Sequence, residues 1–382
     1  MVSEICITGG SPWEHFFGYY DKSPWCRSGR YILALEVKCA SRQPRNGEEA
    51  KIGIIDTENG YNFIIINRTK TWNLQQGCML QWIGPDFENR IIYNDIVDGR
   101  HASIIYDIKT KETIILKRPI YSINSDATKA VSLNFSRLHR LRLGYGYPNL
   151  EDETSNDPFP SKDGIWLIDI EKNQVELLLS LKDIVEINWN SNMDNSHHWF
   201  NHLEINPDGK RFSFLHRWQS GNIRYSRLFT AGLDGKDIYC LADDQLVSHC
   251  CWKNSSQLLS WTRIGHDGEH YYLFTDLSKQ YEIIGEGILN EDGHPSYSPD
   301  GRYILTDTYP DKLRMRRLII YDTHDNKKYE LGRYLAPFKY DFEHRCDLHP
   351  RWSRDGKMIC FDSAHEGSRQ MYIVVNPLIR SA

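Results

Sequence analysis

The chain has 382 residues, a formal net charge of −5, and charges of both signs mixed along its length. These features exclude a strongly basic nucleic-acid-binding surface and give no reason to expect an anionic membrane as a partner. No apolar run approaches the ~20 residues that a membrane span requires, and the length suits one large all-β domain.

The N-terminus, MVSEICITGG, has neither the basic nor the apolar region of a signal peptide. The nine cysteines form no evident paired framework and no CxxC motif. We therefore expect a reduced, cytoplasmic protein, and export by an untypical route stays open.

A strand–turn–strand unit recurs along the chain. Its clearest copies are HLEINPDGKRFSF (202–214), HPSYSPDGRYIL (294–305) and HPRWSRDGKMICFD (349–362). Seven equivalent turns occur, at residues 27–30, 85–88, 125–128, 207–210, 253–256, 299–302 and 354–357. The turns at Asp208, Asn254 and Asp300 are 46 residues apart. A repeat of this length indicates a propeller or a solenoid.

Each unit continues with a third and a fourth apolar run, such as GIWLIDI (164–170) and QVELLLS (174–180). Four strands in seven units predict an all-β, seven-bladed β-propeller of four-stranded antiparallel blades, and a pair of β-sandwiches is the alternative. We expect a single domain over residues 1–382, with a polar inserted loop at about 143–163. The N-terminal EICITG is expected to close the last blade, which removes free sheet edges.

In a propeller, the first strands of all blades begin at the face to which the loops between second and third strands return. The predicted starts of the first strands share this face and are Gln75, Gln76, Tyr121, His202, His249, His294 and His349. Four histidines at equivalent positions of successive blades favour a metal or proton-transfer site. The alternative is that each imidazole caps a strand by bonding neighbouring carbonyls.

The densest group of candidate ligands is His344, Asp347 and His349, with His294 from the preceding blade. Imidazole and carboxylate groups in this combination can hold Mn, Zn or Ca-like ions. The alternative is an ion-pair network with Arg345 and Arg351. No motif for an organic cofactor is present.

Elimination from a uronic acid needs a cation that neutralises the carboxylate and a base that removes the neighbouring proton. Two sets of catalytic candidates follow, and the residues alone do not choose between them: His101, Tyr121 and Arg137, or His202, Arg217 and His249. Packing tyrosines and solvated arginines are the structural alternatives.

Further polar and aromatic residues on the same predicted face or in the inserted loop are candidates for substrate binding. They are Tyr20, Gln76, Asn94, Arg140, Tyr145, Tyr147, His365 and Arg369. Tyrosine rings suit stacking against sugars, and arginines suit their carboxylates.

At these residues the chain resembles propeller polysaccharide lyases, namely oligogalacturonate lyase and the propeller ulvan lyases. The segments HFFGYYDKSPW, QQGCMLQW and FDSAHEG carry the resemblance, together with the HPSYSPDG and HPRWSRDG strand pairs. Oligogalacturonate lyase holds a metal with a histidine from one blade and a Gln/His/His set from the next blade. In this chain the first histidine matches His294, and the set matches His344, Asp347 and His349. His344 and Asp347 depart from that ligand set.

The resemblance implies a base at His249, whereas the ulvan-lyase pattern maps to His101, Tyr121 and Arg137. It predicts a lyase that cleaves a uronate-containing oligo- or polysaccharide by β-elimination, assisted by a divalent metal. A non-catalytic propeller that binds glycan or protein, and a metal-dependent glycan hydrolase, are the alternatives. The oligomeric state is not predicted.

Overall fold

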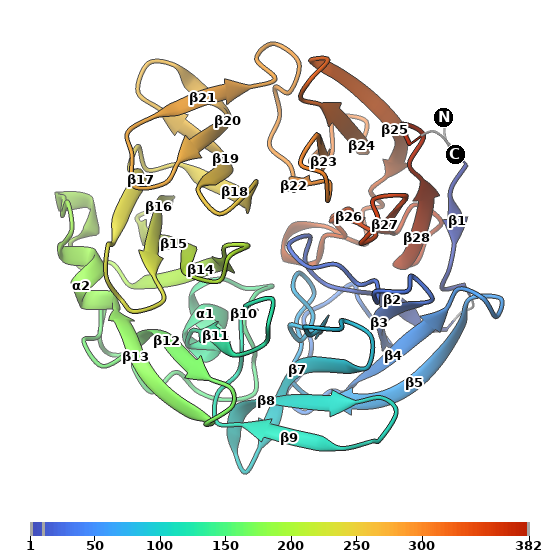
Figure 1. The fold of residues 1–382 in the computed structure, drawn as a ribbon. Coiled ribbons are helices and arrows are strands. Elements are labelled where there is room, and N and C mark those ends of the chain that lie inside the picture. Colours follow the sequence, from blue (N-terminus) through green and yellow to red (C-terminus); the bar gives the residue numbers. More distant parts are fainter. Residues whose placement is uncertain (1–2, 10–11, 380–382) are drawn as a thin grey trace.

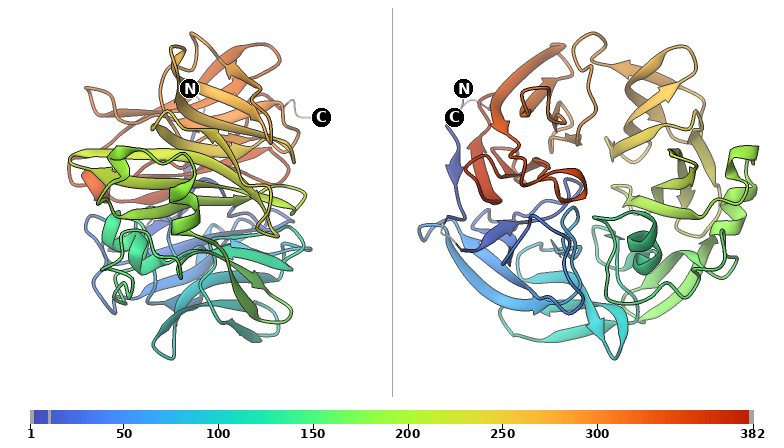
Figure 2. Two further views of the ribbon diagram at one scale, coloured as in Figure 1. Left: turned by 90° about the vertical axis from the view of Figure 1, so that its left-hand side faces the viewer. Right: turned by 180° about the vertical axis from the view of Figure 1, so that it is seen from behind.

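Seven four-stranded antiparallel sheets surround a central axis in the computed structural model, which describes residues 3–9 and 12–379 (Figure 1). This confirms the expected seven-bladed propeller. Seen from its edge, the molecule is a thick disc (Figure 2). No helix within the described ranges is both long and apolar enough to cross a membrane.

The first four blades take their strands consecutively from the chain. They are β2 (Glu14–Phe16), β3 (Tyr31–Val37), β4 (Ala50–Asp56) and β5 (Asn62–Thr69); β6 (Gln81–Trp82), β7 (Arg90–Val97), β8 (Arg100–Asp107) and β9 (Thr113–Leu116); β10 (Ser122–Ile123), β11 (Lys129–Ser132), β12 (Gly164–Asp169) and β13 (Gln174–Ser180); and β14 (His198–Ile205), β15 (Arg211–Ser220), β16 (Ile223–Gly232) and β17 (Tyr239–Ala242).

The last three blades include the closing strand from the N-terminal region. They are β18 (Val247–Trp252), β19 (Gln257–Ile264), β20 (Gly268–Thr275) and β21 (Tyr281–Ile284); β22 (Ser296–Tyr297), β23 (Tyr303–Asp307), β24 (Met315–Asp322) and β25 (Lys327–Leu335); and β26 (Arg351–Trp352), β27 (Met358–Ser363), β28 (Gln370–Val375) and β1 (Ile5–Cys6).

β1 pairs with β28, so that Ile5 lies opposite Ile373, and the first and last strands of the described chain share one blade (Figure 1). This pairing covers the outer edge of β28, which would otherwise offer unpaired backbone groups.

The repeated turn has one hydrogen-bonding pattern in three blades. The side chains of Asp208, Asp300 and Asp355 each accept a hydrogen bond from the backbone N–H two residues further on. The glycine between these groups has a left-handed backbone, with φ of 71° at Gly209 and 73° at Gly301. Asp and Gly therefore set the turn locally and join the first strand to the second.

Within the described ranges, two short α-helices interrupt the pattern of strands. α1 (Phe135–Leu141) lies in the connection between β11 and β12, where Asn134 caps its first turn by accepting from the Arg137 N–H. It stands on the face turned toward the viewer in the right-hand view of Figure 2. α2 (Leu181–Glu186) follows β13, and the 3₁₀ helices η1 (Ser191–Met193) and η2 (Phe342–His344) lie in further connections.

Candidate active site

Irregular backbone brings three histidines to the central channel. β14 shifts its register between Asn201 and Glu204, and His202 within this gap has a φ of 52°. β18 shifts in the same way on either side of His249. His349, two residues before β26, has a φ of 42°. Bulges of this kind re-aim side chains and are common beside active sites.

The loop 17–24, which follows β2, crosses to the middle of the ring (Figure 1). The ring of Tyr19 in this loop lies 4.8 Å from that of His349 and 5.2 Å from that of His202, between ring centroids. The Gly18 carbonyl accepts a hydrogen bond from His349 Nδ1 at 2.9 Å. The loop thus supports the histidines from the axis, and it fixes the His349 tautomer with Nδ1 as the donor.

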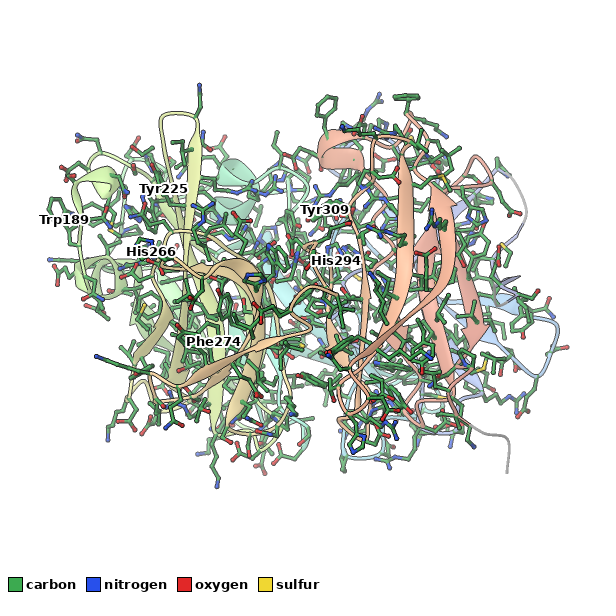
Figure 3. All side chains as sticks on the ribbon, turned by 90° about the horizontal axis from the view of Figure 1, so that it is seen from above. Trp189, Tyr225, His266, Phe274, His294 and Tyr309 are labelled. Carbon is green, nitrogen blue, oxygen red and sulfur yellow. The ribbon has the colours of Figure 1, made fainter. Side chains whose placement is uncertain are left out.

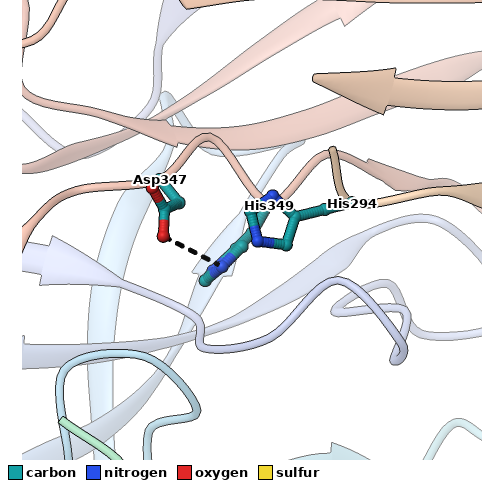
Figure 4. A group of neighbouring side chains, drawn as sticks. All are labelled: His294, Asp347 and His349. Carbon is teal, nitrogen blue, oxygen red and sulfur yellow. Dashed lines mark ion pairs between the residues drawn. The ribbon is translucent and has the colours of Figure 1, made fainter. Parts of the chain in front are cut away.

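His294, Asp347 and His349 form a group that could hold a metal ion, because one ligand atom from each lies within 4.8 Å of the others. Figure 4 shows the Asp347 carboxylate directed at the His349 ring, with His294 beside it. His294 Nδ1 bonds Asp307 Oδ1 at 2.7 Å. The Nε2 atoms of His294 and His349 are buried and have no hydrogen-bond partner within the described residues. Buried nitrogens of this kind, beside a carboxylate, fit the donor set of a divalent cation.

Asp347 is ionised at neutral pH. Burial acts to raise its pKa, but the guanidinium groups of Arg345 and Arg316 hold that pKa well below its ordinary value. Their nitrogens lie 2.6 and 2.7 Å from the carboxylate oxygens without hydrogen-bond alignment. Burial also holds the pKa of His349 well below its ordinary value, so its ring is neutral and Nε2 keeps a lone pair for a metal.

His344 lies at the end of η2, half-buried and outside this group. The extended segment that follows η2 carries Asp347 and His349 into the channel, and His344 precedes it. The structure therefore brings together three of the four residues predicted as ligands.

A pocket of about 290 Å³ lies beside the possible metal group and contains His202, Arg217 and His249. His249 Nδ1 lies 3.0 Å from Asp292 Oδ1, and the hydroxyl of Ser248 donates to the other oxygen of Asp292. Burial and the nearby Arg217 hold the pKa of His202 well below its ordinary value, and burial lowers the pKa of His249. Both imidazoles are therefore neutral and can accept a proton.

The pocket is rich in arginine. Arg142 forms two contacts with the carboxylate of Glu343, at 2.6 and 2.7 Å, and Arg345 pairs with Asp347. Arg217 is buried, and Arg224 is exposed at the rim; neither forms an ion pair within the part of the chain that the structure describes. Unpaired guanidinium groups in a pocket make it attractive to an anion.

A second cavity of about 530 Å³ continues outward from this pocket. It shares Arg142, Arg224, Asp292 and Tyr309 with the inner pocket and adds the segment that contains η2. Tyr309 and His294 lie toward the middle of the molecule, whereas Trp189 lies at its periphery (Figure 3). The inner and outer cavities together form a funnel.

Among the residues predicted to bind substrate, Tyr145 lines the funnel pocket. Tyr20 is buried under it, where its hydroxyl donates to the Cys250 carbonyl. Gln76 is also buried and donates to the hydroxyl of Tyr121, which in turn donates to Asn201. Tyr20, Gln76 and Tyr121 thus support the floor of the channel.

Five other predicted residues make polar contacts within the fold. Asn94 donates to the hydroxyl of Tyr147 at 2.9 Å, and both are buried. Arg140 pairs with Asp152. Arg369 is buried and pairs with Asp362, and His365 bonds the hydroxyl of Ser363.

The structure does not bring His101, Tyr121 and Arg137 together. Arg137, on α1, donates to the carbonyl oxygens of His198, Thr154, Asp157 and Pro158. His101 lines a different cavity, between blades two and three. Arg137 lies on a capped helix, and its guanidinium is directed at the inserted segment.

Several residues of the funnel were missing from the predicted set, among them Arg142, Arg224, Asp292 and Tyr309. Arg224 lies near the tip of an unusually long hairpin, in which β15 and β16 each have 10 residues. The length of this hairpin is visible in the sequence and is a signal that could have indicated Arg224. Asp292 stands two residues before His294, in a connection without periodic pattern.

Two solved structures share this fold over nearly the whole chain. An oligogalacturonate lyase from Vibrio parahaemolyticus superposes with a TM-score of 0.68 at 16% identity, covering 99% of this chain and 94% of the other. An oligogalacturonate lyase in complex with manganese superposes with a TM-score of 0.70 at 15% identity and the same coverage.

A prolyl endopeptidase structure matches less well, with a TM-score of 0.51 at 10% identity, over 94% of this chain and 46% of its own. No family model matches the chain, and no curated protein sequence matches it. The chain is therefore a seven-bladed propeller whose fold resembles that of oligogalacturonate lyases. At these identities the likeness establishes the fold alone.

Proposed function

We propose that the protein is a lyase that cleaves a uronate-containing oligosaccharide by β-elimination in the funnel. One observation carries this proposal: a neutral, buried imidazole, His249, shares a pocket with a buried guanidinium, Arg217, that has no ion-pair partner in the described chain. A base beside a site for a carboxylate is the minimum that elimination from a uronic acid requires.

His249 is the proposed base. Because Asp292 accepts the hydrogen bond at Nδ1, the neutral ring carries its lone pair on Nε2. Nε2 takes the proton from the carbon next to the sugar carboxylate. The electron pair of that C–H bond becomes a C=C bond, and the neighbouring C–O bond breaks. The departing oxygen takes up a proton from solvent, and His249 then releases its proton to solvent, so one product is an unsaturated uronate and the other has a free hydroxyl.

Arg217 is the proposed partner of the sugar carboxylate, and Arg224 at the rim extends the positive surface. Neutralising the carboxylate makes the neighbouring proton easier to remove. His202 lies on the same wall, with its Nε2 3.4 Å from the Tyr19 hydroxyl. In this proposal His202 contacts the substrate and His249 moves the proton.

His294, Asp347 and His349 would hold a divalent cation. Such a cation supplies further positive charge toward the substrate carboxylate. The manganese in one of the similar lyase structures supports a metal of this class. The fold similarity to two oligogalacturonate lyases likewise supports an acidic oligosaccharide as the substrate.

The test is ultraviolet absorbance by the unsaturated product, with a panel of uronate oligosaccharides as substrates. The wild-type protein should generate this absorbance, and His249→Gln should not. New reducing ends without absorbance would indicate a hydrolase and contradict the proposal. Binding without either signal would indicate a non-catalytic glycan-binding propeller.

A further inference from the structure

A large cavity outside the funnel is not used by the proposed reaction. It has a volume of about 660 Å³ and lies between blades two and three. Its walls are the hairpin turn at Gly99 and His101, the connection 117–119, Trp166 of β12 and the inserted segment around Leu150. The funnel is lined by the parts of blade five that correspond to these walls. They are residues 246–249 and residues of β19 and β20. Both cavities therefore open on one face of the propeller.

Four cations line this cavity: Arg100, Lys117, Arg118 and Lys162. None of them forms an ion pair among the residues that the structure describes, although the chain carries a net charge of −5. Glu151, Glu153 and Asp163 also line the cavity. Asp163 is already engaged, because it accepts hydrogen bonds from Asn134, Trp166 and the Gly164 N–H.

Two donors in the wall lack partners. The Arg118 guanidinium lies over the Trp166 ring, 4.1 Å from its centroid, which holds the group flat. Arg118 Nε and His101 Nε2 are both buried without a hydrogen-bond partner in the described ranges. Burial and Arg118 lower the pKa of His101 to about 4, so its ring is neutral and one ring nitrogen can donate. The other side-chain nitrogens of Arg118 and His101 are not fully buried and also form no hydrogen bond among the described residues, so a carboxylate in the cavity can accept from them.

The outer wall is held firmly. The inserted segment is tied to α1 by the Arg137 hydrogen bonds to Thr154, Asp157 and Pro158. Asp152, in the same segment, accepts from Arg140 and from the Thr154 hydroxyl. A polar insertion anchored by a buried arginine provides a rigid wall, as a preformed binding site requires.

We propose that this cavity is a second, non-catalytic binding site for an acidic saccharide, with Arg118 and His101 holding a carboxylate. Its volume exceeds what a single inorganic anion needs and falls within the range of sugar-sized ligands. The proposal takes its ligand class from the proposed function, since a long acidic chain could occupy the funnel and this cavity on the same face.

Calorimetric titration with digalacturonate tests this site without catalysis. The full chain carrying His249→Gln serves as the parent, because it should bind the sugar without cleaving it. We expect two binding events in the parent. Adding Arg118→Gln should weaken one of them by about 10-fold or more and leave the other unchanged. Lys162→Gln, an exposed position that leaves the fold intact, should weaken the same event.

Arg333→Gln is the charge-matched control, since Arg333 is exposed and pairs with Glu330 on β25. A single binding event in the parent, or two events unchanged by both cavity variants, would overturn the second site. Sodium sulfate binding to Arg118 as tightly as the sugar would overturn the assignment to a saccharide. Formation of unsaturated product by the wild type tests the proposed function separately, so either idea can fail alone.

Discussion

Asp292 lies in the segment that leads into blade six, and its carboxylate contacts two residues of blade five. Its Oδ1 atom lies 3.0 Å from His249 Nδ1, and its Oδ2 atom accepts from Ser248 at 2.6 Å. The carboxylate therefore orients the imidazole from behind and leaves Nε2 for a substrate. A carboxylate in this position also stabilises the imidazolium that forms when the base takes up a proton.

His249 and Asp292 should contribute to kcat to different degrees. His249→Gln should lower kcat by roughly 10²–10⁴-fold, because it removes the base. Asp292→Asn should lower kcat less, because the imidazole remains but loses its orienting charge. Initial rates of absorbance measure both effects. His266→Gln is the matched control, since His266 is exposed on the same blade. A His249→Gln variant with wild-type kcat would contradict the assignment.

Replacing Arg217 should have opposite effects on stability and activity. Its guanidinium is buried, and its hydrogen bonds to the carbonyls of Val247 and Ser248 are long, at 3.3 and 3.4 Å. Replacing a buried unpaired charge by an apolar group is often stabilising, so Arg217→Met should raise the free energy of unfolding by about 1 kcal/mol. It should lower kcat/KM by about 10²-fold, since the carboxylate loses its partner.

Thermal melting and initial rates measure the two effects of Arg217→Met. Arg351→Met is the control, because Arg351 is buried but pairs with Asp362 at 3.1 Å. Its loss leaves a buried carboxylate with one partner fewer and should lower Tm. A fall in Tm in both variants would show that Arg217 is structural.

Added manganese should raise the Tm of the wild-type protein, and a chelator should reverse the rise. A ligand at 100 times its Kd stabilises a protein by roughly 2.7 kcal/mol. Asp347→Asn should abolish the shift, since it removes the charged ligand. Asp325→Asn on the outer surface should leave it intact. Elemental analysis that finds no bound metal in the wild type would contradict the site.

The activity of the protein should fall in acid, and so should its stability, for a separate reason. The pKa of His249 is lowered by burial, so kcat/KM should rise with pH through an inflection below the ordinary histidine value near 6.5 and stay level above it. The pH–rate profile of the wild type measures this. An inflection above pH 7 would contradict it.

Burial lowers the pKa values of His101 and His198 to about 4. Between about pH 4 and 6.5 the unfolded chain protonates these residues while the folded protein does not. Each one therefore decreases the free energy of unfolding as the pH falls, by roughly 1.4 kcal/mol per pH unit at most. Urea unfolding at several pH values measures the slope. His101→Gln should make the slope shallower.

Gly18 should tolerate no side chain. It has a φ of 142°, and a Cβ atom there would lie 2.8 Å from the Gln76 carbonyl oxygen. Gly18→Ala should displace the loop that carries Tyr19, reducing both Tm and activity. Gly29 also has a positive φ, but a Cβ atom there meets nothing within 4 Å. Gly29→Ala should therefore lose only the stability that the backbone strain costs. Equal losses of Tm in the two variants would contradict the contact expected at Gly18.

The sequence by itself determined the propeller and the order of its blades. Asp-Gly turns, apolar runs and their repeated spacing are local features, and the seven turns predicted at positions such as 207–210 and 299–302 join first and second strands as expected. The equivalent positions of His202, His249, His294 and His349 followed from the same repeat, because side chains at equivalent points of successive blades converge on one axis.

Only the tertiary structure decided which other side chains share the funnel. Arg224 reaches it from the tip of the β15–β16 hairpin, and Asp292 from a connection that has no periodic pattern, whereas bulges at His202 and His249 set the direction of the rings. Arg137 was predicted on the same face, yet α1 directs it to the carbonyls of the inserted segment. A repeat fixes where strands begin and end, whereas the contacts of loops and bulges depend on residues far apart in the chain.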